Sequence, residues 1–199
     1  MFTNLPLLVL LVVCISGTRA CFSNNSQNQT FPHVIEHRRS IRDYTNQYVS
    51  EDVLDRILHA GLRAPSSLGE QQIHFTVSRN RRLNKEVSDI VTGNPNLDNI
   101  FYNAPIVVYV HSRAVVPGFD DLDGAVAVQN MLLQAKYEGL GSCAIGYLVS
   151  NNRHDLIKAK VGIPLNHQLV IGIILGYGKS DGGAAPEIKP GRVRKIPTY

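Results

Sequence analysis

Apolar residues along this chain follow two patterns that alternate with each other. Behind Ser50, the residues Val53, Leu54, Ile57 and Leu58 recur at helical spacing, which is typical of a helix with one buried face. Residues 106–110 instead form a continuous and largely β-branched run, which is typical of a buried central strand. Applied to the whole chain, these patterns predict helices over residues 31–38, 51–61, 81–91, 120–140 and 151–161, and strands over residues 74–78, 106–110, 142–148 and 168–177.

The order of these elements indicates the α+β class. Strands and helices are interleaved, but the connections vary in length and no glycine fingerprint follows the first strand, which disfavours a doubly wound sheet. Gly139-x-Gly141 follows a helix, so it predicts a helix end with a left-handed glycine. The helix over residues 120–140 is apolar nearly all round, so we expect burial on several sides, with another subunit as one candidate neighbour.

The first thirty residues are expected to lie outside the folded domain. Residues 5–15 form an apolar run that is too short to span a bilayer, and the segment ending at Ala20 suits a signal peptidase. We predict a signal peptide over residues 1–20, a polar disordered leader over 21–30 and one domain over 31–199. Export into the secretory pathway follows, with no stable membrane span after cleavage; an uncleaved anchor is the alternative.

Composition and charge narrow the range of partners. With 199 residues, of which 44% are hydrophobic and 18% charged, the chain can bury one core. The formal net charge is +4, but the positive residues gather in one N-terminal and one C-terminal cluster instead of forming a stripe with interleaved aromatic residues. This distribution favours a small anionic ligand and argues against nucleic acid.

The N-terminal cluster is the first candidate site. Arg38, Arg39 and Arg42 bring three guanidinium groups close together, and Ser40 adds a hydroxyl between them. The planar fork of arginine donors matches phosphate oxygens, so the cluster suits a phosphorylated ligand. A solvated basic surface is the simpler interpretation of the same residues.

Two further segments complete a known combination of motifs. Residues 64–75 read APSSLGEQQIHF, and residues 139–146 read GLGSCAIG. Together with the arginine cluster they resemble the FMN-dependent nitroreductase family, whose signatures are R-R-S-x-R, A-P-S-x-x-N-x-Q-P-W and G-L-G-S-x-x-x-G. The resemblance extends from Phe31 to the C-terminus. It implies a nitroreductase-like fold in which helices pack on a central sheet that is mostly antiparallel or mixed.

The resemblance also implies roles for individual residues. Arg38, Arg39 and Ser40 would bind the phosphate and ribityl part of FMN, and Arg42 would approach the N1–C2=O side of the ring. A positive charge there would stabilise the reduced flavin. Backbone N–H groups just past the G-L-G-S turn would point at flavin N5 and O4, which maps onto Ile145, Gly146 and Tyr147. The other cofactor-binding residues implied by the family are Ala144 beside this segment and Arg192 and Arg194 at the phosphate.

The loop over residues 64–72 matches the family in part. Pro65, Ser66, Ser67 and Gln71 stand where the family has them, but Gly69 replaces the usual Asn, Gln72 the Pro and Ile73 the Trp. In relatives this loop reaches the flavin of the opposite subunit, so the resemblance implies a homodimer with two shared FMN sites. The chain contains no Trp, and Ile73 and Ala144 stand where relatives often carry one, which predicts a wide acceptor pocket.

The activity implied by the resemblance is ping-pong hydride transfer through flavin N5. NADH or NADPH would be the electron donor, and nitroaromatics, quinones or related small molecules the acceptors. The cofactor carries this chemistry, so no catalytic side chain is expected. Two alternatives stay open: a secreted flavin-binding protein without turnover, and a zinc peptidase built on His33, Glu36 and His37, which match H-x-x-E-H.

Overall fold

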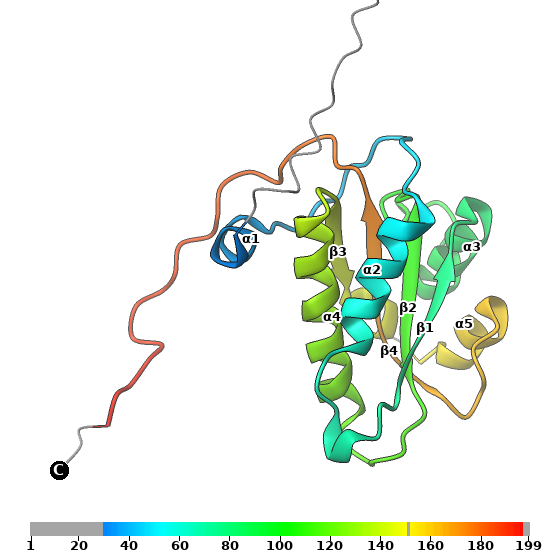
Figure 1. Ribbon diagram of the computed structural model, residues 1–199. Helices are drawn as coiled ribbons and strands as arrows, with labels where there is room; N and C mark the ends of the chain where they lie inside the picture. Colours follow the sequence, from blue (N-terminus) through cyan, green and yellow to red (C-terminus); the bar gives the residue numbers. More distant parts are fainter. Residues whose placement is uncertain (1–29, 151, 197–199) are drawn as a thin grey trace, which may run out of the picture.

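The centre of the molecule is an antiparallel sheet. The computed structural model describes residues 30–150 and 152–196, and Figure 1 gives its arrangement. Its strands are β1 (Ile73–Ser78), β2 (Ile106–Ser112), β3 (Gly141–Ile145) and β4 (Gln168–Gly176), and they lie in the order β1-β2-β4-β3. Every pairing between neighbours in this order is antiparallel. The expected α+β fold with a mostly antiparallel sheet is confirmed.

Helices cover both faces of this sheet (Figure 1). The face with α2 (Glu51–Leu62) and α4 (Asp120–Tyr137) forms one hydrophobic core, and the face with α3 (Arg81–Thr92) and α5 (His154–Val161) forms a second. The short helix α1 (Phe31–His37) packs beside α4, away from the sheet.

The burial of β2 on both faces explains why apolar and polar residues do not alternate in its sequence. Ile106, Val108 and Val110 belong to the core under α2 and α4, whereas Val107 and Tyr109 belong to the core under α3 and α5. All five side chains are fully buried. Because successive side chains of a strand point to opposite faces, a strand covered on both faces needs apolar residues at every position.

Several predicted boundaries are wrong by a few residues. Helix α4 ends at Tyr137 instead of residue 140, because Gly139 adopts a left-handed φ of 78° as expected of a helix end. Strand β3 ends at Ile145, where the chain turns into a 3₁₀ segment over Gly146–Val149. Helix α5 begins at His154 instead of residue 151. The predicted signal peptide and all of the leader but Thr30 lie outside the described residues.

The arginine-bearing segment is tied to the free edge of β3. The backbone N–H of Ile41 donates to the carbonyl of Ser142 at 3.0 Å, and Ser40 forms a parallel bridge with Ser142. Residues further along this segment then bond to the chain that leaves β4. These bonds run from the Lys179 N–H to the Asp43 carbonyl at 3.0 Å and from the Thr45 N–H to the Tyr177 carbonyl at 2.8 Å.

Gly141 permits this close approach. A Cβ atom at this position would lie 2.8 Å from the Cβ of Ile41, a distance that real Cβ contacts do not reach. The second glycine of the G-L-G-S motif is therefore a packing requirement, whereas the first, Gly139, is a helix end.

We expect Gly141→Ala to destabilise the fold by about 1–3 kcal/mol, because the added methyl would meet the Ile41 Cβ, which cannot rotate away and whose backbone is bonded to Ser142. Denaturant unfolding measures this difference. Gly146→Ala is the matched control, since no atom lies within 4 Å of its added Cβ and its φ is not left-handed. Equal losses of stability in the two variants would contradict the role of Gly141.

Candidate functional site

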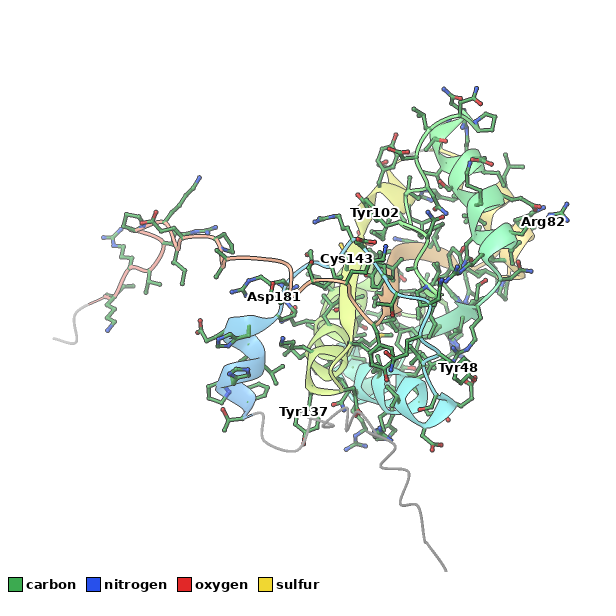
Figure 2. All side chains as sticks on the ribbon, turned by 90° about the horizontal axis from the view of Figure 1, so that it is seen from above. Tyr48, Arg82, Tyr102, Tyr137, Cys143 and Asp181 are labelled. Atoms are coloured by element: carbon green, nitrogen blue, oxygen red, sulfur yellow. The ribbon has the colours of Figure 1, made fainter. Side chains whose placement is uncertain are left out.

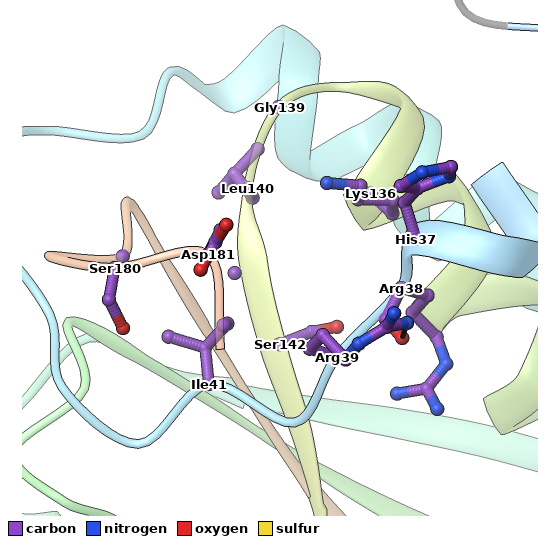
Figure 3. Close-up of a pocket in the computed structure, with 12 residues that line it drawn as sticks. His37, Arg38, Arg39, Ile41, Lys136, Gly139, Leu140, Ser142, Ser180 and Asp181 are labelled. Carbon is purple, nitrogen blue, oxygen red and sulfur yellow. Dashed lines mark hydrogen bonds between the residues drawn. The ribbon is translucent and has the colours of Figure 1, made fainter. Parts of the chain in front are cut away.

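The arginine cluster opens onto a basic cavity of about 260 Å³. The cavity lies where the segment after α1, the end of α4 and the chain after β4 meet (Figure 3). Its charged and polar lining is His37, Arg38, Arg39, Lys136, Ser142, Ser180 and Asp181. Basic groups outnumber the single carboxylate, so the cavity suits an anion.

The first two arginines have different tasks. Arg39 donates from Nη1 to the carbonyls of Glu36 at 2.7 Å and Arg38 at 2.8 Å, and from Nε to the carbonyl of Gly183 at 3.2 Å. It therefore fixes the local backbone. The Arg38 guanidinium has no hydrogen bond or ion pair within the described part of the chain, so its donors are available to a ligand. Ser40 is exposed beside it.

Lys136 was not predicted as a site residue. It occupies the last turn of α4 and lines the same cavity as Arg38. A basic residue in the last turn of a helix is common, because it interacts favourably with the helix dipole, so nothing in the sequence distinguishes this lysine from others. Only the turn at Gly139, which brings the end of α4 against residues 37–41, reveals its position.

A second cavity of about 210 Å³ adjoins the other half of β3. It brings Arg42 together with Ala144, Ile145 and Gly146, as the family motifs imply. The Ser142 carbonyl points away from β4, toward Ile41 at the edge of the sheet. Backbone groups of a strand alternate between its two edges, so the N–H of Ala144, two residues further on, faces the same free edge.

Two tyrosines complete this second cavity, and of these Tyr102 was not predicted as a site residue. Tyr102 and Tyr147 line it, and both are exposed. The Arg42 guanidinium carbon lies 5.8 Å from the centroid of the Tyr102 ring, within the range of a cation–π contact. No carboxylate among residues 30–150 and 152–196 forms an ion pair with Arg42.

The loop over residues 64–72, which carries the A-P-S motif, lies at the opposite end of α4. The buried carboxylate of Asp123, in the first turn of α4, accepts hydrogen bonds from the Ser67 N–H at 3.1 Å and the Ser67 hydroxyl at 2.8 Å. It also accepts one from the Gln72 side chain at 3.1 Å. Gln72 in turn accepts from the Val116 N–H at 2.8 Å. The loop over residues 64–72 is thus held rigidly on the helix.

Part of this loop has left-handed backbone. Leu68 has φ 54°, Gly69 φ 73° and Gln71 φ 48°. Asn and Gly are the residues that tolerate this region best, so Gly69 keeps the backbone conformation available where the family has Asn, although the side chain is lost. Leu68 is 88% exposed at the tip. Pro65 and Ser66 line a separate cavity of about 370 Å³ together with His74 and Asp123.

Within one chain, the motifs do not form a single site. Asp123 and Lys136 are thirteen residues apart on α4 (136 − 123 = 13), which corresponds to about 20 Å along the helix. The loop with Pro65, Ser66, Ser67 and Gly69 therefore lies one helix length from the arginine cavity. Arg192 and Arg194 are exposed on a tail that runs away from the body (Figure 1), and their assignment to the phosphate stays a prediction.

The zinc-peptidase pattern gains no support. The rings of His33 and His37 stack on each other in α1 with centroids 3.9 Å apart. In the described part of the chain, no group of three His, Cys, Asp or Glu side chains is arranged to hold a metal ion.

Among the helices that the structure describes, none is both long and apolar enough to cross a bilayer.

Three histidines meet beside the cavity of the loop. The Nδ1 atoms of His111 and His167 lie 2.7 Å apart, and the rings of His74 and His167 have centroids 5.0 Å apart. Burial, together with the two neighbouring imidazoles, lowers the pKa of His111 to about 4. Burial also lowers the pKa values of His74 and His167, and the nearby Arg113 adds to both shifts.

These pKa shifts predict loss of stability in acid. The folded-state pKa of His111 lies below its ordinary value of 6.5, so the folded chain binds fewer protons than the unfolded chain. The contribution to stability is complete above pH 6.5 and is lost as the pH falls toward 4. Each unit of lowered pKa corresponds to about 1.4 kcal/mol at the acid limit.

We therefore expect His111→Gln to reduce the difference between the melting temperatures at pH 7 and pH 5. Gln retains hydrogen-bonding groups but does not titrate. The control is His59→Gln, because His59 is exposed on α2. If the parent and His111→Gln lose the same stability between these pH values, the histidine cluster does not cause the acid sensitivity.

The fold and its two basic cavities define an α+β domain suited to an elongated anion, and comparisons identify its family. A model of the nitroreductase family matches residues 35–177. Over 146 residues the chain is 34% identical to an Archaeoglobus fulgidus protein assigned as an NADH dehydrogenase/NAD(P)H nitroreductase, covering 72% of this chain and 83% of that protein. The chain belongs to the nitroreductase family.

Two further relatives carry the flavin in their names. The chain is 25% identical over 193 residues to the NAD(P)H FMN reductase of Bacillus subtilis, covering 86% of this chain and 75% of that protein. A crystal structure of a Bacteroides fragilis nitroreductase with bound FMN has a TM-score of 0.73 and 26% identity to this chain. That match covers 85% of this chain and 100% of the other.

Proposed function

We propose that this protein is an FMN-dependent oxidoreductase that uses NADH or NADPH. The observation that carries the proposal is the pair of unneutralised arginines, Arg38 in the 260 Å³ cavity and Arg42 in the neighbouring one, along a single strand edge. A ligand with a phosphate at one end and an electron-rich ring at the other would place the phosphate at Arg38 and the ring at Arg42. The relatives named for FMN reduction and for bound FMN support the same ligand.

The residues of both cavities fit the parts of FMN. Arg38 and Lys136, which line the first cavity, would hold the phosphate together with the exposed Ser40 hydroxyl beside it. Arg42 and the free edge at Ala144–Gly146 would hold the ring. When bound, FMN supplies the chemistry, accepting a hydride at N5 and passing it on. The protein's part is to orient the ring and to place the Arg42 charge where negative charge accumulates on reduction.

The acceptor we propose is a nitroaromatic, a quinone or a related planar molecule. Ala144, one of the residues that line the second cavity, has a small side chain, and Tyr102 and Tyr147 add aromatic rings to the same lining. Planar acceptors stack well on such rings. A small residue at position 144 leaves room for the bulkier members of this class.

We propose further that the working form is a homodimer in which the loop of one subunit completes the site of the other. The loop at Ser66 and Ser67 carries a family motif but lies about 20 Å along α4 from the arginine cavity of its own chain. A second copy that packs antiparallel along α4 would bring the two halves together twice, with the same contacts at both sites.

Exposed apolar side chains support this dimer. Along the outer face of α4, Leu122 is 60% exposed and Val126 40%, and Tyr137 closes the row near the helix end. Leu68 at the loop tip and Ile188 on the tail are more exposed still. Several large apolar side chains that are exposed in one chain are consistent with a face that another chain covers.

Visible absorption tests the proposed function directly. The purified protein is expected to be yellow and to bleach when NADH or NADPH is added without oxygen. The predicted signal peptide makes a secreted flavin carrier the rival proposal, and such a carrier would stay yellow under the same conditions. A colourless protein that does not take up added FMN would contradict both proposals.

Arg38→Ala is expected to weaken FMN binding by roughly 10- to 100-fold, because a charge-assisted hydrogen bond contributes about 1.5–3 kcal/mol. Titration of the apoprotein with FMN measures the change. Arg82→Ala is the matched control, since Arg82 is a highly exposed arginine on α3 that pairs with Glu86. Equal affinities of the parent and Arg38→Ala would contradict the phosphate assignment.

Mixed dimers test the shared site. We expect Arg38→Ala and Ser66→Tyr each to lose tight FMN binding as homodimers, because one removes the phosphate contact and the other fills the loop face. A heterodimer of the two variants carries both defects at one site and neither at the other. It should therefore bind one FMN tightly per dimer. A heterodimer with no tight site would show that both changes act within one chain.

A further inference from the structure

We propose that Tyr102 is a positioning residue that holds the Arg42 guanidinium at the flavin ring and thereby favours the reduced cofactor. The inference rests on the proposed function. Its structural basis is the contact between the two side chains, with the guanidinium carbon 5.8 Å from the ring centroid, inside the cavity that also contains Ala144 and Gly146.

Tyr102 is held in place by a specific turn before β2. Tyr102 and Asn103 both have left-handed backbone, with φ 51° and 53°. The Asn99 side chain accepts from the Phe101 N–H at 2.9 Å and donates to the Asn103 side chain at 3.1 Å, while the Asn99 carbonyl accepts from the Tyr102 N–H at 2.8 Å. Non-glycine residues in this region cost free energy, so the surrounding bonds must impose the conformation.

The anchor of this turn is the buried neighbour of Tyr102. Phe101 is fully buried and meets the Tyr109 ring edge-on, with centroids 6.0 Å apart. Because Phe101 is fixed in the core and the next two residues are left-handed, the Tyr102 side chain projects outward while remaining 41% exposed. The turn therefore places an aromatic ring at the cavity and leaves little freedom for it elsewhere.

An aromatic ring suits Arg42 better here than a carboxylate would. Arg42 is exposed, and a long exposed side chain samples many rotamers unless a partner restrains it. An Asp or Glu partner would restrain it but would also neutralise its charge. A ring face attracts the guanidinium while carrying no net charge, so the full positive charge stays available to the ligand.

This arrangement has a measurable consequence for the cofactor. Reduced FMN carries negative charge on N1, so a fixed cation there binds the reduced form more tightly than the oxidised form. Loss of the ring would let Arg42 move into solvent, and the preference for the reduced form would fall. A cation–π contact at an exposed site corresponds to a change of about threefold in that preference.

The experiment compares the affinities for oxidised and reduced FMN, obtained from the midpoint potentials of bound and free cofactor. We expect Tyr102→Leu to lower the reduced-to-oxidised affinity ratio about threefold and Tyr102→Phe to retain the parent's ratio, because Phe keeps the ring. Tyr48→Leu is the matched control. Tyr48 makes a cation–π contact with Arg79 at 5.0 Å and lies well apart from Tyr102 (Figure 2).

Two outcomes would overturn the role of Tyr102: an unchanged ratio in Tyr102→Leu, or an equal fall in Tyr102→Phe. A parent protein that does not retain FMN would overturn the proposed function and this inference together, so the two failures are distinguishable. The apoprotein gives a second readout. Ring currents of Tyr102 should shift the Arg42 side-chain proton resonances, and Tyr102→Leu but not Tyr102→Phe should abolish the shift; identical resonances in parent and Tyr102→Leu would refute the contact.

Discussion

The close contact between residues 38–45 and the edge of β3 is the constraint on which the rest of the site depends. The bond from Ile41 to the Ser142 carbonyl fixes this segment in register, and the missing side chain of Gly141 lets the two backbones approach. Once the register is set, Arg38 lies at the end of α4 and Arg42, four residues further on, lies beside Ala144. A shift of one residue would turn both side chains to the opposite face and separate the cations from their cavities.

The helices, the strands and the class of the fold could be predicted from the sequence, because the spacing of apolar residues reflects which face of each element is buried. The run at residues 106–110 is one such case, since β2 is covered on both faces. Boundaries were missed where a short backbone feature decides, as at Ile145, where β3 turns into a 3₁₀ segment. Tyr102 and Lys136 could not be predicted as site residues, because only the tertiary arrangement brings them to the cavities.

The two neighbouring arginines of the motif show how one residue type divides into two roles. Arg39 donates hydrogen bonds to three backbone carbonyls and so fixes the local chain, whereas the donors of Arg38 stay free for a ligand. From the sequence, both arginines were predicted to bind the phosphate, because the sequence around a guanidinium does not show which group it will contact. The difference arises from Gly183 and Glu36, residues far apart in sequence, whose carbonyls converge on Arg39 alone.

Helix α4 carries a functional group at each end, with Asp123 holding the loop and Lys136 facing the arginine cavity. The length of α4 therefore sets the distance between the two halves of the site. Inserting one residue within it would lengthen it by about 1.5 Å and rotate one end by about 100° relative to the other. Substitutions on its outer surface do not change this distance or this rotation. Over evolutionary time the length of α4 should therefore tolerate far less change than its composition.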